Sequence, residues 1–485
     1  MSETTQALDL DAAELKKMGY EQELHRHMSG FSNFAISFSI ICILAGGISA
    51  FPQALGAGGG ASVGIGWLVG SLFAVIVAMA MGQISSSYPT AGGLYHWGSI
   101  LGGKGYGWCT AWFNLLGLIF VVASVNYGVY DPFFKTLVES LFGLDIPATM
   151  FIAVVTTIQA ILIYRFPKFT TKITDISGYL IFVLAVVLTL SLLAFNKTAL
   201  DFSRLITFTN FTGAEGSVWP KTEGMFYPFL SGLLLTVYTI TGFDASAHTS
   251  EETHDAAKTV PKGIVNSVVY SAIFGYIMIC TFVLVMPDLA AAVKQGMGFF
   301  DSLLSSLPTT LKAVLGIGIF LVNFLCGLAC LTSCSRMMFA FARDGGLPAS
   351  SFIRKIDPTL KTPVAAVWVS GILAFAATLY GDAFVVLSTG SAVFLYISYV
   401  MPVAAGLLAE GKTWKHKGPF DLGSMSKPIA SLAIIGGGFL VFVGIQPPNE
   451  KVLYLTIAML VVMAIFWFVL GESKRFKGPP MITEY

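Results

Sequence analysis

The chain has 485 residues, of which 55% are hydrophobic and 11% are charged, and its formal net charge is +1. Soluble domains carry about 25% charged residues, so this chain cannot cover a soluble globule with polar surface. The composition predicts an integral membrane protein, and the near-zero net charge argues for neither a nucleic-acid nor an acidic partner, so we expect no nucleic acid.

Apolar stretches long enough to cross a hydrocarbon core of about 30 Å recur along almost the whole chain. We expect about twelve transmembrane helices and therefore an all-α polytopic fold. The predicted spans are 31–55, 65–86, 107–133, 147–164, 174–195, 226–250, 263–286, 312–341, 363–380, 384–408, 429–446 and 452–470.

Positive charge sets the expected orientation, because Lys and Arg are retained on the cytoplasmic side. Most of the 28 Lys and Arg residues fall in segments on the same side as the N-terminus. Both termini are therefore expected in the cytoplasm. The first thirty residues are polar and do not have the short apolar core of a signal peptide. The cytoplasmic (inner) membrane is the expected location.

Two of the predicted helices contain glycine-rich interruptions. The first is interrupted over Ala45, Gly46, Gly47, Ile48 and Ser49, and the sixth over 241–245. Broken membrane helices are tolerated mainly where they line a cavity, and paired breaks indicate the binding site of a transporter. Helices one to five and six to ten each begin with such a helix, which predicts two inverted repeats.

The expected domains follow from this division. Residues 1–29 form a cytoplasmic N-terminal segment and 30–408 a transport core of ten helices. Residues 409–470 contain a loop and the two peripheral helices eleven and twelve, and 471–485 form a cytoplasmic tail.

Each break offers its own chemistry. The N–H groups that open the second half of helix one, with the positive helix end, attract a carboxylate. Ala45, Gly46 and Gly47 would let a ligand approach the backbone. Alternatively, the glycines only permit tight helix crossing. In helix six the last carbonyls suit an ammonium group.

The second half-site would include Tyr238, Thr239, Thr241 and Gly242, and a tyrosine can offer a cation-π face to an amine. Asp244 is an acidic residue deep within a span, which marks it as a functional candidate. It could bind substrate or exchange a proton during turnover. Equally, it could be a buried carboxylate that holds the broken helix open.

Several motifs resemble a known family. The run Pro89-Thr90-Ala91-Gly92-Gly93 resembles a signature of the amino acid-polyamine-organocation (APC) permeases. Further matches lie at 45–52, at 242–244 with Glu251 and Glu252 downstream, and at 335–348, in the right order. The segment 242–252 is most similar to the amino acid/choline transporter branch. The resemblance implies a five-plus-five inverted-repeat (LeuT-like) fold with discontinuous helices one and six.

The resemblance also implies roles for individual residues. Tyr238 takes the place of the aromatic lid over bound substrate. Thr332, Ser333 and Ser335 in helix eight lie where the wider fold can form a cation site, so Na⁺ and H⁺ are both possible coupling ions. Hydroxyls in membrane helices more often bond to their own backbone. Some proton-coupled relatives carry a Lys in helix five, and this chain has none over 174–195.

Further candidates rest on position. Asn126 and Asn323 could line the pocket walls. Glu251 and Glu252 could pair with Arg336 or Arg343 as a gate, or they could be solvated loop charges. His96, His248 and His254 could titrate near neutral pH, but lone histidines at helix ends are more often structural.

Cys326, Cys330 and Cys334 share one face of helix eight, where packing as small hydrophobes is the favoured interpretation over a metal site. The sequence contains no metal-ligand cluster, nucleophile elbow or phosphate-binding loop, so we expect neither an enzyme nor a cofactor.

The expected function is a secondary active permease for an amino acid or small amine such as 4-aminobutyrate, working by alternating access. A choline, ethanolamine or polyamine carrier is the alternative within the class. A channel or a transport-derived receptor is the alternative outside it. Lipid is the expected surrounding, and the sequence leaves the oligomeric state open.

Overall fold

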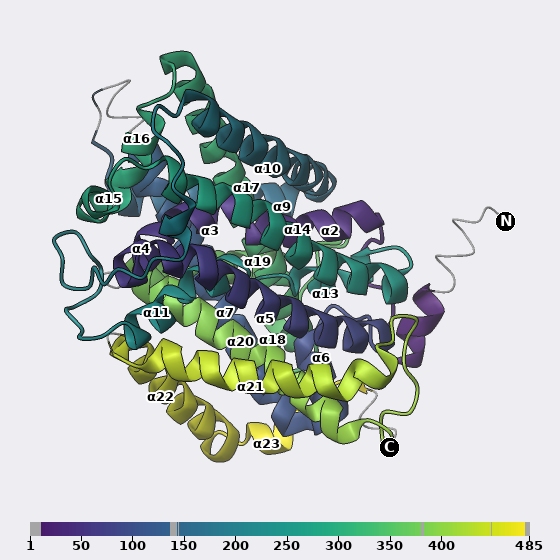
Figure 1. Ribbon diagram of the computed structural model, residues 1–485. Helices are drawn as coiled ribbons and strands as arrows, with labels where there is room; N and C mark the ends of the chain where they lie inside the picture. The colour runs from purple at the N-terminus through teal and green to yellow at the C-terminus, as the bar shows by residue number, and fades with distance from the viewer. Residues whose placement is uncertain (1–10, 136–142, 144, 380–382, 448, 481–485) are drawn as a thin grey trace.

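A bundle of long helices makes up the computed structural model, which describes residues 11–135, 143, 145–379, 383–447 and 449–480 (Figure 1). Ten helices among these residues are long and apolar enough to cross a membrane. Two shorter apolar helices, Phe226–Thr239 and Val364–Ala377, occupy the sixth and ninth places. The described residues therefore confirm the expected all-α polytopic architecture with about twelve spans.

The first five spans each correspond to one long helix or to a set of shorter ones in line. They are formed by α2 (Gly30–Ile41), α3 (Ile43–Ser49) and α4 (Phe51–Gly58) for the first span, then α5 (Gly60–Ser87), α7 (Lys104–Val129), α9 (Ala148–Arg165) and α10 (Pro167–Phe195).

The remaining spans repeat this pattern, with the sixth again divided. They are α11 (Phe226–Gly232), α12 (Leu234–Thr239) and α13 (Ala245–His248), then α14 (Ala256–Val285), α17 (Thr309–Arg343), α19 (Val364–Ala377), α20 (Ala383–Ala409), α21 (Ser426–Ile445) and α22 (Glu450–Ala464).

Short helices connect the spans. They are α6 (Leu94–Gly102), α15 (Leu289–Gln295), α16 (Phe299–Leu304), α18 (Ser350–Ile353) and α23 (Glu472–Arg475), with 3₁₀ turns η2 (Phe202–Leu205), η3 (Ser250–Glu252), η4 (Gly296–Gly298) and η5 (Gly423–Met425) and π-helical turns η1 (Tyr130–Lys135) and η6 (Ile465–Val469).

The largest differences from the predicted spans are at helix starts. Helix α10 begins at Pro167 and α14 at Ala256, each seven residues before the predicted spans 174–195 and 263–286. The added turns contain Lys168, Lys172 and Lys258, which are compatible with a helix but lower the hydropathy of the segment. Hydropathy therefore locates the part of each helix in lipid, whereas the hydrogen-bonded helix extends beyond it.

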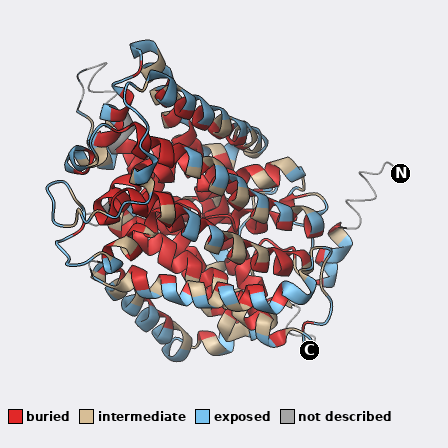
Figure 2. Cartoon of the chain, viewed as in Figure 1, coloured by how far each residue is buried: buried red, intermediate tan, exposed pale blue. Residues whose placement is uncertain are grey.

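Burial divides the bundle into an inner and an outer group of helices (Figure 2). All residues from Ala35 to Gly64 and from Leu234 to Thr253 are buried, so both interrupted helices lie inside the protein. Helices α10, α21 and α22 instead present exposed apolar side chains such as Leu190, Ile435 and Leu460. In a membrane these faces contact lipid, which explains why they need no protein partner.

Connections of different kinds gather at the two ends of the bundle. The segment 11–28 lies at one end, on the right of Figure 1, and main-chain hydrogen bonds join it to the turn η3. The short helices α15 and α16 lie at the other end, at the upper left. We refer to the end that holds η3, where the sequence suggests a gate, as the gate end.

Candidate functional site

The interruption of the sixth span lies over Ile240–Asp244, as predicted for 241–245. Helix α12 ends at Thr239 and the next helical turn, α13, begins at Ala245. Gly242 has φ +83°, in the left-handed region that favours glycine, and a Cβ there would overlap Ile40 at the end of α2. Glycine is therefore required at this position for two reasons. Its backbone conformation disfavours other residues, and Ile40 of the first span leaves no room for a side chain.

Side chains from two other spans bind the freed backbone groups of this break. The Tyr396 hydroxyl of α20 donates to the Ile240 carbonyl at 3.0 Å, and the Gly242 N–H donates to the Tyr399 hydroxyl at 2.9 Å. The Ser37 hydroxyl of α2 donates to the Phe243 carbonyl at 2.9 Å. Buried backbone groups in a membrane need such partners, and here they come from the protein itself.

Asp244 ends the break and is fully buried. Its Oδ1 accepts from the Tyr399 hydroxyl at 2.8 Å, and its Oδ2 accepts from Asn114 Nδ2 of α7 at 2.8 Å. His248 Nε2, one turn later, lies 3.1 Å from Oδ2. Asp244 therefore helps to fix the break and at the same time forms a carboxylate-imidazole pair.

The interruption of the first span is one turn earlier than predicted. It lies at Cys42, with φ 24° and ψ 83°, whereas Ala45 to Ser49 belong to helix α3. The Ala45 and Gly46 N–H groups already donate to the Cys42 carbonyl, at 2.8 and 3.0 Å. The Cys326 thiol of α17 donates to the Ile40 carbonyl just before the break, at 3.3 Å.

Close packing accounts for the two glycines of α3. A Cβ on Gly46 would lie 2.9 Å from Thr239 Oγ1 and 3.0 Å from Thr239 Cα, and one on Gly47 would lie 3.2 Å from Met278 Cε. The glycines therefore permit α3 to approach α12 and α14, which is the alternative that the sequence left open. The N–H groups that open α3 belong to Ile43 and Leu44, next to Cys42. Ile48 and Ser49 are buried further along α3.

The polar groups at the end of α12 are bonded locally. Thr239 Oγ1 donates to the Leu235 carbonyl and Thr241 Oγ1 to the Tyr238 carbonyl, each at 2.7 Å. Tyr238 is buried and its hydroxyl donates to Ser124 Oγ of α7 at 3.0 Å. The tyrosine therefore joins the sixth and third spans beside the break.

The two candidate asparagines have partners away from the breaks. Asn126 Nδ2 donates to Thr156 and Gln159 of α9, at 3.0 and 2.9 Å, and Gln159 Nε2 donates back to Asn126 Oδ1. Asn323 Nδ2 donates to the Ile319 carbonyl of its own helix at 2.8 Å. In this conformation both side chains stabilise helices.

The hydroxyls of α17 differ from one another. Thr332 and Ser335 donate to carbonyls of their own helix, those of Leu328 and Thr332, at 2.8 Å each. Ser333 is fully buried, and its hydroxyl has no hydrogen-bond partner within the described residues. Of the three, Ser333 is the one whose hydroxyl is not already engaged.

Two buried ion pairs join η3 to α17 at the gate end. Arg343 donates from both guanidinium nitrogens to Glu251, at 3.0 and 2.9 Å, and Arg336 Nε donates to Glu252 at 2.8 Å. Burial acts to raise the pKa of both carboxyls. The arginines outweigh burial, so the pKa of each lies below its usual range. The predicted pairing of these residues is confirmed, and they are not solvated loop charges.

The N-terminal segment covers these ion pairs. The N–H groups of His27 and Met28 both donate to the Glu252 carbonyl, and the His254 N–H donates to the Met28 carbonyl. Gln22 Nε2 donates to the Glu251 carbonyl at 2.8 Å, and Arg26 donates to the Ser250 carbonyl at 3.1 Å. The segment is thus fastened to η3 and lies over the two ion pairs.

A second buried cluster lies beside the first. Asp344 Oδ2 accepts from the hydroxyls of Tyr20 and Tyr95, at 2.7 and 2.9 Å, and His96 Nε2 lies 3.1 Å from it. Burial acts to raise the pKa of Asp344, but His96 and the neighbouring Arg343 hold it below its usual range. Tyr20 thereby connects the N-terminal segment to α6 and to the end of α17.

The turn 89–93 connects the break to the gate. The Ala91 carbonyl lies 3.1 Å from His248 Nδ1, and the Ala91 N–H donates to Glu251 Oε1 at 3.1 Å. A Cβ on Gly93 would lie 3.2 Å from the His248 ring. The Pro-Thr-Ala-Gly-Gly run is therefore a turn packed against the imidazoles of His248 and His96.

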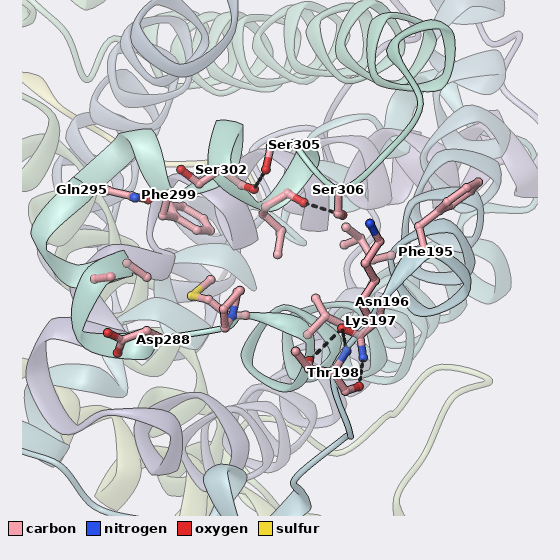
Figure 3. A pocket seen from close by; sticks show the side chains of 17 residues that line it. Phe195, Asn196, Lys197, Thr198, Asp288, Gln295, Phe299, Ser302, Ser305 and Ser306 are labelled. Carbon is pink, nitrogen blue, oxygen red and sulfur yellow. Dashed lines mark hydrogen bonds between the residues drawn. The ribbon is translucent and has the colours of Figure 1, made fainter.

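A pocket of about 390 Å³ opens at the end opposite the gate, between the ends of α10 and α14 and the α15–α16 segment (Figure 3). Lys197, Phe299, Ser302, Ser305 and Ser306 lie around it. None of its lining residues belongs to α3, α12 or α13, so it is separate from the two breaks.

Known proteins identify the family. A family model described as amino acid permease matches residues 28–469. The chain belongs to the amino acid permease family. The permease is accordingly a transporter of the APC superfamily with the five-plus-five fold, and not an enzyme.

Individual relatives match along nearly the whole chain. The permease is 31% identical to the amino-acid permease BAT1 of Arabidopsis thaliana, over 97% of this chain and 96% of the relative. It is 28% identical to the GABA-specific permease of Saccharomyces cerevisiae, over 90% of this chain and 78% of the relative. It is 26% identical to a putative polyamine transporter of Candida albicans, over 97% and 89%.

Some residues of this site were not expected from the sequence. The partners of the break, Tyr396, Tyr399 and Asn114, lie far from it along the chain. His248 was interpreted as structural, although its spacing of four residues from Asp244 would place the two side chains together on a continuous helix. That four-residue spacing was the feature of the sequence that could have identified His248 as the partner of Asp244.

Proposed function

We propose that this permease moves an amino acid or a small amine, such as 4-aminobutyrate, across the cytoplasmic membrane by alternating access. The observation that carries this proposal is that the two interruptions meet. Gly242 in the second break packs on Ile40 beside the first, and Gly46 packs on Thr239. One small ligand could therefore contact both helix ends at once.

The helix ends that meet have opposite polarity. The N-terminus of α3 is the positive end of its helix and suits a carboxylate, and the C-terminus of α12 is the negative end and suits an ammonium. Ala45, Thr239, Thr241 and Asp244 surround this junction. A molecule that carries both charges fits such a junction better than one that carries a single charge.

Access would be controlled at the gate end. The Glu251–Arg343 and Glu252–Arg336 pairs, with the segment 11–28 over them, close this end in the present conformation. Opening would require both pairs to separate, while Tyr238 would close the opposite side over the ligand. We place the gate end, both termini and the tail after 471 in the cytoplasm, in keeping with the Lys and Arg distribution.

A polyamine is the less favoured substrate. A polycation would need several carboxylates without cationic partners, whereas Asp244, Glu251 and Glu252 each lie against an imidazole or a guanidinium. Choline and ethanolamine are less favoured for a different reason, since neither has a carboxylate for the N-terminus of α3.

Counterflow in proteoliposomes tests this proposal directly. Vesicles loaded with an unlabelled candidate should take up the same labelled compound faster than empty vesicles do, in a saturable manner. The candidates are neutral amino acids, 4-aminobutyrate, choline, ethanolamine and spermidine. Counterflow of a zwitterion supports the proposal, and uptake of choline or spermidine alone overturns the carboxylate half-site. Flux that does not saturate would indicate a channel.

A further inference from the structure

We propose that Asp244 and His248 together form the coupling-proton site of this permease, and this inference rests on the transport function proposed above. Both side chains are fully buried, and His248 Nε2 lies 3.1 Å from Asp244 Oδ2. Asp244 was a functional candidate from the sequence, whereas a structural role was favoured there for His248.

The hydrogen bonds fix where the proton lies. His248 Nδ1 lies 3.1 Å from the Ala91 carbonyl, which can only accept, so Nδ1 must carry a hydrogen. In the neutral ring the other nitrogen, Nε2, then has only a lone pair. Because Nε2 faces a carboxylate oxygen, one further proton must lie between Nε2 and Oδ2 in this arrangement.

The other contacts of Asp244 favour its ionised form. The Tyr399 hydroxyl and Asn114 Nδ2 both donate to it, and the Tyr399 hydroxyl is itself oriented by the Gly242 N–H. The pair is therefore an imidazolium beside a carboxylate, neutral as a whole. A neutral pair is far less costly inside a membrane than the lone carboxylate that would remain without the proton.

The charged groups nearest to the pair belong to other contacts. Glu251 reaches it only through Ala91 and is held by Arg343 of α17. From α20 the titratable neighbour is Tyr399, and α7 offers the neutral Asn114. His96 of α6 packs on the same turn as His248 but lies against Asp344. Within the described residues, Asp244 and His248 thus form a distinct site for one proton.

The turn at Ala91 would couple this proton to the gate. The Ala91 carbonyl binds His248, and the Ala91 N–H binds Glu251. Separation of Glu251 from Arg343 would therefore move Ala91 and, with it, the hydrogen bond to the His248 imidazole. When water from the gate end takes the Nε2 proton, two acceptors remain 3.1 Å apart. They repel each other, so the closed conformation binds the proton and the open one releases it.

Two assays on the same proteoliposomes test the inference. Counterflow at equal pH measures substrate exchange, and accumulation driven by a pH gradient measures coupling. With one proton per neutral substrate, a gradient of one pH unit sustains about tenfold accumulation. The variant His248→Gln, whose amide can still donate to Asp244 but does not titrate, should keep counterflow and lose this accumulation. His254→Gln, at the partly exposed start of the next loop, is the matched control and should keep both.

The outcomes separate the two proposals. Absence of counterflow in the wild type overturns the transport function itself. Counterflow without pH-driven accumulation in the wild type overturns only the proton site, as does accumulation retained by His248→Gln. A folded His248→Gln that loses both activities would show a structural role and also overturn it. If His248→Gln does not fold, His248→Asn, which also has an amide that does not titrate, is judged by the same two assays.

Discussion

Replacing Gly242 by alanine tests whether the left-handed backbone at the break and its contact with Ile40 stabilise the fold. Gly242 has φ +83°, and a Cβ there would overlap Ile40. The left-handed backbone costs a non-glycine residue about 1–2 kcal/mol. Forcing a methyl group against a packed side chain costs about 1–3 kcal/mol more. We therefore expect Gly242→Ala to destabilise the permease by about 2–5 kcal/mol.

Gly411 provides the matched control. Its φ is +80°, and no heavy atom lies within 4 Å of where its Cβ would be. Gly411→Ala should therefore carry only the backbone cost, about 1–2 kcal/mol. Thermal unfolding of the purified variants measures both, and the transition of Gly242→Ala should lie clearly below that of Gly411→Ala.

A double-mutant cycle with Ile40→Ala separates packing from backbone strain. Ile40→Ala removes the side chain that the new methyl group would overlap, so the double variant should be less destabilised than the sum of the single variants. Equal effects of Gly242→Ala and Gly411→Ala, or strict additivity with Ile40→Ala, would refute the contact between the two breaks.

Three further outcomes concern Glu251, Asp344 and Tyr238. Glu251→Gln leaves Arg343 buried without its carboxylate, which should cost the closed conformation about 3–5 kcal/mol and speed hydrogen exchange in residues 20–28. The lowered pKa of Asp344 contributes stability above its usual value of 3.8, and this is lost as the pH falls through the lower folded value. The wild type should therefore lose thermal stability below about pH 4 by more than Asp344→Asn does. Tyr238→Phe loses the bond to Ser124, about 1 kcal/mol, and should retain counterflow, whereas Tyr238→Ala should lose it.

The sequence predicted the spans well because lipid imposes a simple rule. A helix must present apolar residues for its full depth in the membrane, and this pattern survives in a single sequence. Helix starts such as Pro167 and Ala256 were missed because their polar first turns project beyond the lipid. The hydrogen bonds that continue these helices leave no hydropathy signal.

The two breaks differed in how far they could be predicted. Gly242 marks its break correctly because the backbone there has a positive φ. Gly46 and Gly47 pointed to a break one turn too late, because they are required by neighbouring helices and not by their own backbone. The real interruption is at Cys42, whose residue type gives no indication of a positive φ.

The polar site was the least predictable part. Ion pairs such as Glu252–Arg336 could be anticipated from the order of the helices, since both residues fall at the same end of the bundle. The partners of Asp244 could not, because Tyr399 and Asn114 come from distant spans. Asn126 was expected to line the pocket, but nothing in one sequence indicates that an amide faces Gln159 of the next helix.

The fastening of the N-terminal segment has a consequence for how such a carrier can diversify. Residues 27 and 28 are held to 252 and 254 through main-chain groups, which every amino acid possesses. The side chains of residues 27 and 28 can therefore change while these main-chain bonds remain, whereas Gln22 and Arg26 bind η3 through their side chains. In the proposed gate, each such change would alter how long the gate stays closed. Under the proposed mechanism, turnover would then change through residues that do not contact the substrate, and selectivity would be preserved.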